Sequence, residues 1–310
     1  MNKNKEEQPV ALLFAGQGNP VIGMGADLWD LNQATKRIWD CASDISGMDI
    51  RRLCLKGPMN RLIQTTVQQV AVTAINVTLF TLCREKLHSF EIVGSCGHSV
   101  GEYSALYAAG AISLETLFQM IHFRANVMND LSHSNKGHML AVKGIDHQRL
   151  QNLITYSGMA IDISCDNSRH QQVVGGESDA LGAFSRVLLD TGYESVKLGV
   201  SGAWHTRLMA DGVPLMRDYL ASVDIDCPQH AVLMNVTGKA EQDPECIKEN
   251  LSLHLTHTVK WTDSMDQFLI NEPPVLFVEI SNKAYLGQML NDFIGFSPDK
   301  IAHCKTLLSN

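Results

Sequence analysis

The sequence lacks the features of a nucleic-acid-binding protein. Its formal net charge is −8, it holds no basic stripe, and its densest run of cations is the pair Arg51-Arg52. Domains that bind nucleic acid usually gather Lys and Arg on one face or along one helix. We therefore expect no nucleic-acid partner. An acidic protein partner likewise finds no obvious large landing patch in the sequence.

Paired cysteines and long apolar runs are also missing. The eight cysteines stand singly, with no Cys-x-x-Cys pair, which in a chain of this length indicates reduced thiols and neither a disulfide framework nor a zinc site. No apolar run approaches the roughly 20 residues of a membrane span, and the polar N-terminus does not resemble a signal peptide. We expect a cytoplasmic protein that binds no metal and no membrane.

The sequence does contain the pattern of a layered globular fold. It is 45% hydrophobic and 19% charged, which is ordinary for a folded domain. Short apolar runs at 10–14 and 92–96 have the length of buried strands, and helical spacing of apolar residues follows at 31–45, 67–86 and 113–130. Strands that alternate with helices predict an α/β fold with a parallel sheet.

The pattern changes between about residues 135 and 200. Strands and helices are expected there in the order βαββαβ, at 138–143, 146–156, 159–165, 171–175, 177–191 and 193–199. This order is that of the ferredoxin-like unit. We predict a large α/β hydrolase-like domain with a parallel sheet, formed by residues 1–134 plus 201–310. A small ferredoxin-like domain of residues 135–200 is inserted in it.

A candidate nucleophile lies on a turn between an expected strand and an expected helix. The segment Gly97-His98-Ser99-Val100-Gly101 fits Gly-x-Ser-x-Gly, in which the glycines permit a sharp turn that lifts the serine hydroxyl off the sheet. The N-terminus of the following helix offers free N–H groups and a partial positive charge to an oxyanion. The alternative is a glycine-rich turn with an unimportant serine.

A nucleophilic serine requires a base, and His205 is the leading candidate among the twelve histidines. It lies where the small domain should rejoin the large one, and clefts form at such junctions. His98 adjoins Ser99 on the turn, but neighbours on a turn point in different directions, so we expect it to be packed and hydrogen-bonded. We interpret His254 and His257 as surface residues in polar surroundings.

Arg124 occupies an unusual position for a charged residue. It shares a stripe at helical spacing with the apolar residues Leu117, Ile121 and Met128, which places it on the side that faces the core. A buried arginine is costly unless a carboxylate or a phosphate meets it. The stripe therefore indicates either a structural ion pair with Asp or Glu or a site for an anionic ligand.

Together these residues resemble the malonyl-CoA:acyl carrier protein transacylase family, which includes the acyltransferase components of fatty-acid and polyketide synthases. The resemblance extends from about Ala11 to Leu290. Its elements occur in family order: Phe14-Ala15-Gly16-Gln17-Gly18, Gly97 to Tyr103, Arg124, Asn167-Ser168 with Val173 to Gly176, Ala203-Trp204-His205, Asn235 to Gly238, Val259-Lys260-Trp261 and Phe277 to Ile280.

The resemblance implies a role for each matched residue. Ser99 would be the nucleophile and His205 its general base, with the histidine held by a backbone carbonyl near Lys260, so no catalytic Asp is named. The backbone N–H groups of Gln17 and Val100 would form the oxyanion hole.

The acyl pocket follows from the same resemblance. Arg124 would bind the free carboxylate of a malonyl group, and Gln69 and Asn167 would line the pocket. Trp204 precedes the histidine at a position that is aromatic in malonyl-selective members, so it would exclude a branch at the acyl α-carbon.

The implied reaction moves a malonyl group, or a closely related acidic acyl group, from coenzyme A to the phosphopantetheine thiol of acyl carrier protein. The coenzyme A thioester is a substrate, and no cofactor is implied. The protein would act as a monomer or as part of a synthase complex. Three alternatives remain: an α/β-hydrolase esterase, a hydrolase of the same family that clears acyl groups from carrier proteins, and a malonyl-transferring subunit of a malonate decarboxylase complex.

Overall fold

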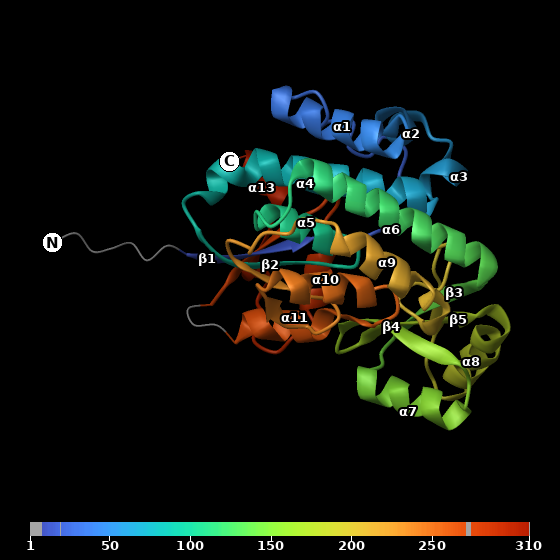
Figure 1. The fold of residues 1–310 in the computed structure, drawn as a ribbon. Coiled ribbons are helices and arrows are strands. Elements are labelled where there is room, and N and C mark those ends of the chain that lie inside the picture. The colour runs from blue at the N-terminus through green and yellow to red at the C-terminus, as the bar shows by residue number, and fades with distance from the viewer. Residues whose placement is uncertain (1–7, 19, 271–273, 310) are drawn as a thin grey trace.

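The computed structural model describes residues 8–18, 20–270 and 274–309. The N-terminal residues 1–7 lie outside this part, and so does the expectation about a signal peptide that rests on them. Figure 1 shows a large α/β layer structure that continues on one side into a smaller sheet with two helices of its own.

The large sheet has six strands, and all neighbouring pairs are parallel except the last. Their order is β11 (Ile301–His303), β10 (Leu276–Ile280), β1 (Pro9–Phe14), β2 (Glu91–Gly97), β7 (Ala231–Leu233) and β8 (Ala240–Glu241). Strand β1 lies in the middle and is buried along its whole length. A strand covered on both faces reads as a continuous apolar run, which is why residues 10–14 are all apolar.

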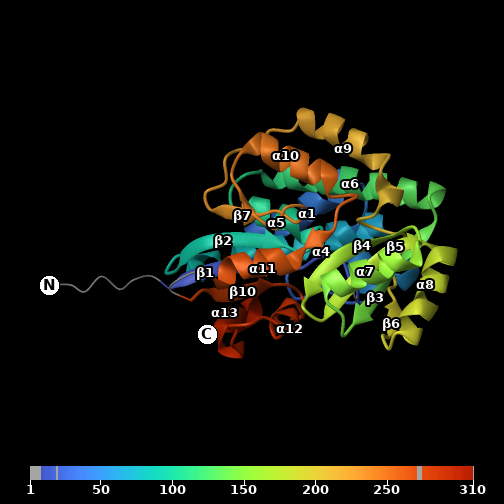
Figure 2. The same cartoon turned by 90° about the horizontal axis from the view of Figure 1, so that it is seen from below.

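Helices cover both faces of this sheet (Figures 1 and 2). The helices outside the small domain are α1 (Gln33–Ser46), α2 (Ile50–Lys56), α3 (Met59–Leu62), α4 (Thr65–Leu87), α5 (Gly101–Ala108), α6 (Leu114–Ser134), α9 (Gly212–Ala221), α10 (Pro244–Leu253), α11 (Trp261–Leu269), α12 (Leu286–Leu290) and α13 (Cys304–Ser309). Helices α1, α2 and α3 form an outer layer that packs on α4 and α6. Short 3₁₀ turns occupy Arg207–Met209 and Pro298–Lys300. Helix α4 is long and apolar enough for a membrane span, but 83% of its most apolar window is buried inside the protein.

The small sheet has the strand order of the ferredoxin-like unit plus one added strand. Its order is β6 (Ser195–Lys197), β3 (Gly137–Lys143), β5 (Gln171–Glu177), β4 (Ile161–Ser168) and β9 (Val259–Lys260), with α7 (His147–Ser157) and α8 (Ser178–Asp190) beside it. Numbered by their place in the unit, the first four strands run 4-1-3-2. Strand β9 comes from the later part of the chain and pairs in parallel with β4, which the sequence did not predict. The α/β fold class is confirmed, and we propose 135–200 as the inserted domain because these four strands fall within it.

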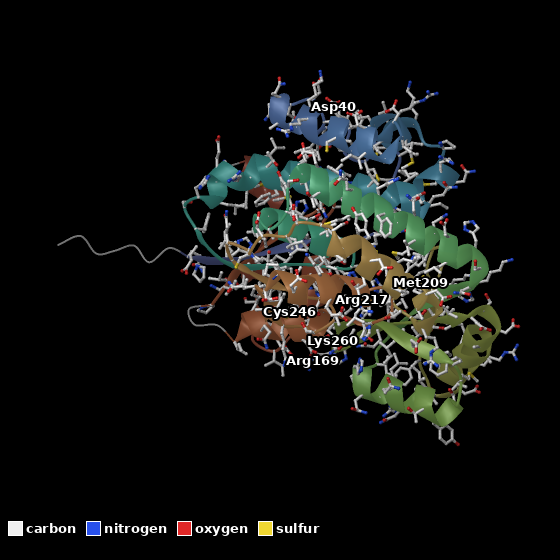
Figure 3. The ribbon with its side chains drawn as sticks, viewed as in Figure 1. Asp40, Arg169, Met209, Arg217, Cys246 and Lys260 are labelled. Carbon is white, nitrogen blue, oxygen red and sulfur yellow. The ribbon has the colours of Figure 1, made fainter. Side chains whose placement is uncertain are left out.

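The two faces of the small sheet bury different partners. Leu140, Ile163 and Val174 point to one face and pack with α7 and α8 in a core of their own. Met139 and Val173 point to the other face and join the core of the large domain. At the rim of this contact Arg169, labelled in Figure 3, lies 2.6 Å from Asp266 on α11. The small sheet is therefore held against the large domain along one whole face.

The turn between β2 and α5 depends on glycine at two positions. A Cβ on Gly97 would overlap the carbonyl carbon of Gly101, and a Cβ on Gly101 would overlap the carbonyl oxygen of Phe14. Both obstacles are backbone atoms that no side-chain rotation can move. This close packing brings the N-terminus of α5 against the ends of β1 and β2.

We predict that Gly97→Ala lowers the free energy of unfolding by about 3 kcal/mol or more, because the added methyl meets backbone that cannot relax. The measurement is urea unfolding followed by circular dichroism. Gly182→Ala on α8 is the matched control, because its Cβ would meet no atom within 4 Å and a helical Gly→Ala change stabilises by roughly 0.5–1 kcal/mol. Equal effects of the two substitutions would show that the turn is not constrained as described.

Candidate active site

Ser99 and His205 have unusual backbone conformations. Their φ angles are 51° and 59°, and within the described residues they are the only two non-glycine residues with positive φ. Such a conformation costs about 1–3 kcal/mol and persists where the surrounding structure enforces it, often at functional sites. Ser99 lies on the turn that leads into α5, and His205 lies in the segment between β6 and the 3₁₀ turn at Arg207–Met209.

The two side chains meet in hydrogen-bond geometry. Ser99 Oγ lies 2.9 Å from His205 Nε2, and His205 Nδ1 lies 2.7 Å from the carbonyl oxygen of His254. A carbonyl oxygen can only accept, so Nδ1 must carry the proton. Nε2 then presents its lone pair to the serine hydroxyl. The histidine is thus in the tautomer that can take a proton from Ser99.

The surroundings of His205 favour its neutral form. The side chain is buried, and burial lowers its pKa well below the usual value, with the nearby His254 and Arg124 acting in the same direction. A neutral imidazole at neutral pH is the form that a general base requires.

Arg124 is buried on α6 among the apolar residues of its stripe and points at the nucleophile. Its Nη2 lies 3.3 Å from Ser99 Oγ, and its Nη1 donates to Gln69 Oε1 at 2.5 Å. Its Nε has no hydrogen-bond partner among the described residues. No Asp or Glu in the described ranges pairs with it, so the structural ion pair left open by the sequence is not found. Burial lowers the pKa of the Arg124 guanidinium, and the neighbouring Tyr103 and Glu102 oppose that shift.

A line of hydrogen bonds on α4 orients Gln69 toward this arginine. Gln69 Nε2 donates to Thr65 Oγ1 at 2.7 Å, and Thr65 Oγ1 donates to Gln17 Oε1 at 3.0 Å. Because the amide nitrogen of Gln69 is engaged on one side, its oxygen is turned to Arg124. Gln69 is thus held in contact with the guanidinium by hydrogen bonds that run back to Thr65 and the half-buried Gln17.

Two backbone N–H groups are available near Ser99. Within the described part of the chain neither Gln17 N nor Val100 N donates a hydrogen bond. Val100 precedes the first residue of α5, and Gln17 follows the end of β1, which pairs with β2. Free donors at a helix N-terminus suit a developing negative charge on oxygen.

The structure adds three residues that the sequence did not single out as site residues. Asn235 Oδ1 accepts from Ser99 N at 2.8 Å, and Asn235 Nδ2 donates to the carbonyl of Gly97 at 2.8 Å. Asn235 N donates to Glu102 Oε1 at 2.6 Å, and Glu102 Oε2 lies 2.9 Å from His254 Nδ1. The contacts close a ring that runs from Ser99 through Asn235, Glu102 and His254 to His205.

Two expectations about histidines need correction. His254 is not a surface residue, because its side chain is fully buried against Glu102. The carbonyl that holds His205 belongs to His254, six residues before Lys260. His257 is exposed, as expected. The error arose because His254 has polar neighbours in sequence, whereas its place at the end of α10 turns it into the core.

Asn167 and Trp204, which the sequence analysis predicted to line the acyl pocket, form no side-chain hydrogen bond with Ser99 or His205 within the described residues. Asn167, at the end of β4, meets His98 Nε2 at 2.8 Å through its Oδ1 and so links the two sheets. Trp204 is buried, and its six-membered ring lies against Gly202. The predicted pocket-lining roles of both residues stay predictions.

Metal ligands do not gather in the described part of the chain, where no group of three or more His, Cys, Asp or Glu could hold an ion. A surface hollow of about 670 Å³ lies on the face formed by α1, α6 and α9, and none of its lining residues belongs to the site.

Sequence comparison agrees with this geometry. The acyl transferase domain family matches residues 11–303. The polyketide biosynthesis malonyl CoA-acyl carrier protein transacylase PksC of Bacillus subtilis is 31% identical over 277 residues, which cover 87% of this chain and 92% of PksC. The putative uncharacterized protein YmdE of Escherichia coli is 62% identical over 102 residues, which cover 33% of this chain and 95% of YmdE.

Two further matches cover more than nine-tenths of this chain. The polyketide biosynthesis protein ThaF of Burkholderia thailandensis is 34% identical over 286 residues, which cover 92% of this chain but only 24% of ThaF. The solved structure of a malonyl CoA-acyl carrier protein transacylase from Coxiella burnetii has a TM-score of 0.89 and 25% identity, covering 98% of this chain and 97% of that one. The chain therefore belongs to the acyl transferase domain family and is an acyltransferase, which confirms the resemblance found in the sequence.

The buried Glu102 gives a testable pH dependence. Burial raises its pKa from 4.5 to about 8, against the opposing effects of the Asn235 N–H and of Arg124. The stabilising contribution of the protonated group is complete below pH 4.5 and is lost as the pH rises to about 8, because the unfolded chain releases a proton that the native protein retains.

We predict that Glu102→Gln removes this loss. The amide oxygen of the introduced glutamine can still accept from Asn235 N, so the fold is kept. Between about pH 5.5 and 7.5 the wild type should lose up to about 1.4 kcal/mol more stability per pH unit than the variant. Urea unfolding at several pH values measures the difference, and Glu115→Gln, at an exposed site, is the control. Parallel curves for wild type and Glu102→Gln would mean that Glu102 is ionised in the native protein.

Proposed function

We propose that the protein transfers a malonyl group from malonyl-CoA to the phosphopantetheine thiol of acyl carrier protein, by way of an ester on Ser99. One observation carries this proposal: a buried guanidinium, without a carboxylate partner in the described residues, points at the oxygen of the nucleophile. A malonyl ester on Ser99 would supply the missing carboxylate at that place. The names of PksC and of the Coxiella burnetii enzyme support the same reaction.

The first half of the reaction follows from the geometry of the pair. His205 Nε2 takes the proton of Ser99 as Oγ attacks the thioester carbonyl, and the N–H groups of Gln17 and Val100 stabilise the oxyanion. When the tetrahedral intermediate collapses, the carbon–sulfur bond breaks, and coenzyme A leaves as a thiol with the proton from His205. The Ser99 ester remains, with its carboxylate on Arg124.

The second half reverses these roles. His205 takes the proton of the phosphopantetheine thiol, and the sulfur attacks the ester carbonyl. The new thioester forms as the bond to Ser99 breaks, and His205 returns the proton to Oγ. No metal or prosthetic cofactor enters either half. We further propose that Gln69 orients Arg124 and that Trp204 excludes a branched acyl group.

The alternative functions account for fewer of the residues in the site. An esterase or a clearing hydrolase gives a buried arginine beside the nucleophile no task. A subunit of a malonate decarboxylase complex would use the same malonyl transfer, so it differs in partner and not in chemistry. We propose that the protein acts in the cytoplasm, for fatty-acid or polyketide synthesis.

We expect Ser99→Ala to abolish the covalent malonyl adduct, and His205→Ala to slow its formation by about 10³–10⁶-fold, as is typical when a nucleophile or its base is removed. Intact-mass spectrometry after incubation with malonyl-CoA measures both. Detection of a malonylated Ser99→Ala protein would rule out this nucleophile.

We expect Arg124→Ala to lower kcat/KM for malonyl-CoA by about 10²–10⁴-fold and to spare acetyl-CoA, because only the malonyl group carries the charge that the guanidinium binds. Arg124→Lys should restore little, since an ammonium cannot form the planar two-bond contact. The malonyl-to-acetyl ratio of kcat/KM is the measurement. A ratio unchanged by the substitution, with a lowered melting temperature, would assign Arg124 to stability.

A further inference from the structure

Exposed apolar side chains are concentrated on one part of the surface. Of the twelve large hydrophobic residues that are exposed in the described ranges, six lie between positions 21 and 63. Five of them are Val21, Ile22, Leu55, Met59 and Ile63, with exposed fractions of 40% to 52%. Single exposed apolar residues are normal, whereas a cluster marks an interaction site. These five residues, together with Arg52, Lys56 and Arg61, are called the α2–α3 face.

Contacts show that the two parts of the α2–α3 face adjoin. The side chain of Ile22 lies against Gly57, which separates α2 from α3. Gly23 N donates to the carbonyl oxygen of Cys54 on α2 at 2.7 Å. Met59 and Ile63 are four residues apart and so share a side of one helical turn. The loop and the two short helices therefore present one continuous surface.

The charge of the α2–α3 face is opposite to that of the whole protein. Residues 50–64 contain four cations and no Asp or Glu, in a chain of net charge −8. Arg51 is neutralised by Asp40 at 2.7 Å. Arg52, Lys56 and Arg61 are exposed and form no ion pair with any described residue. Three such cations thus share the α2–α3 face with five exposed apolar side chains.

The α2–α3 face adjoins the active site through the chain itself. Two residues after Ile63, Thr65 begins α4 and binds Gln17, and Gln69 on the next turn binds Arg124. Figure 1 shows α2 and α3 in the outermost layer of the large domain, beside α1 and above α4 and α6. The start of α4 thus connects the α2–α3 face to Arg124 through side-chain hydrogen bonds.

We propose that the α2–α3 face docks the carrier protein that accepts the acyl group, an inference that rests on the proposed function. A carrier protein is an acidic partner, and its arm is attached through an anionic phosphodiester. Exposed cations would steer such a partner, and the apolar side chains would be covered by its surface. Apolar residues spread over two helices and a loop match the surface of a protein partner better than they match coenzyme A.

Arg207, which lies just after His205 beside the junction of the two domains, is less suited to this role. Arg207 makes a two-pronged contact with the carboxylate of Asp162, through Nε at 3.0 Å and Nη2 at 2.5 Å. Its charge is thereby compensated within the chain. The unpaired cations of the α2–α3 face carry no such counter-charge.

The two half-reactions of a ping-pong enzyme allow a clean test. The double variant Lys56→Glu/Met59→Ser should lower kcat/KM for holo-acyl carrier protein of bacterial fatty-acid synthesis by about 10–100-fold, and its rate should depend less on salt. Its kcat/KM for malonyl-CoA and its rate of Ser99 acylation should equal those of the wild type. The matched control is Arg186→Glu/Leu189→Ser on α8, an exposed cation and an exposed apolar residue at the same spacing.

Each other outcome decides against the proposal in a different way. An unchanged kcat/KM for the carrier would remove the α2–α3 face as the docking site and leave the reaction intact. A loss confined to malonyl-CoA would assign the face to the nucleotide of coenzyme A. An equal loss in the control variant would show a general charge effect. Failure of the wild type to load any carrier would overturn the proposed function itself.

Discussion

The hydrogen bond from His205 Nδ1 to the backbone carbonyl of His254 is the contact on which the site depends. Among the described residues no carboxylate pairs with the His205 ring, so this carbonyl decides which ring nitrogen carries the proton. A carbonyl has no charge to stabilise an imidazolium. The carbonyl therefore sets only the tautomer and the orientation of the His205 ring. The proposed mechanism then requires that the imidazole be neutral before it takes a proton. Burial of His205 supplies that condition by lowering its pKa.

The residue that carries this carbonyl, His254, is linked to the Ser99 turn by a series of contacts. Asn235 binds the backbone on both sides of the turn, at Ser99 N and Gly97 O, and its own N–H binds Glu102. Glu102 lies on the first turn of α5 and meets the ring of His254. The nucleophile and the group that orients its base are thus attached to one buried carboxyl side chain, and a shift of α5 would move both together. This coupling explains how two residues with positive φ, far apart in sequence, are held at 2.9 Å.

The sequence could predict the elements that local pattern and motif define. Helical spacing placed the stripe of Arg124, and the glycines around Ser99 predicted the turn, because both depend on neighbours in the chain. Strand β9 and the ring through Asn235 and His254 depend on residues that are distant in sequence, so no local pattern could reveal them. His254 shows the limit most clearly: its polar neighbours suggested the surface, whereas the packing at the end of α10 buries its ring fully. Even so, the resemblance had placed Asn235 within a matched segment, without giving it a role.

The same long-range contacts explain why the site lies between two sheets and not within one. His205 arrives on the segment that leaves the small sheet, and Asn167 at the end of β4 reaches back to His98 beside the nucleophile. Strand β9 returns to the small sheet from the large domain, only five residues after His254. Because β9 is paired with β4, the segment that follows His254 is joined to the small sheet. His254 also meets Glu102 on α5, so the carbonyl that orients His205 lies between contacts to both domains.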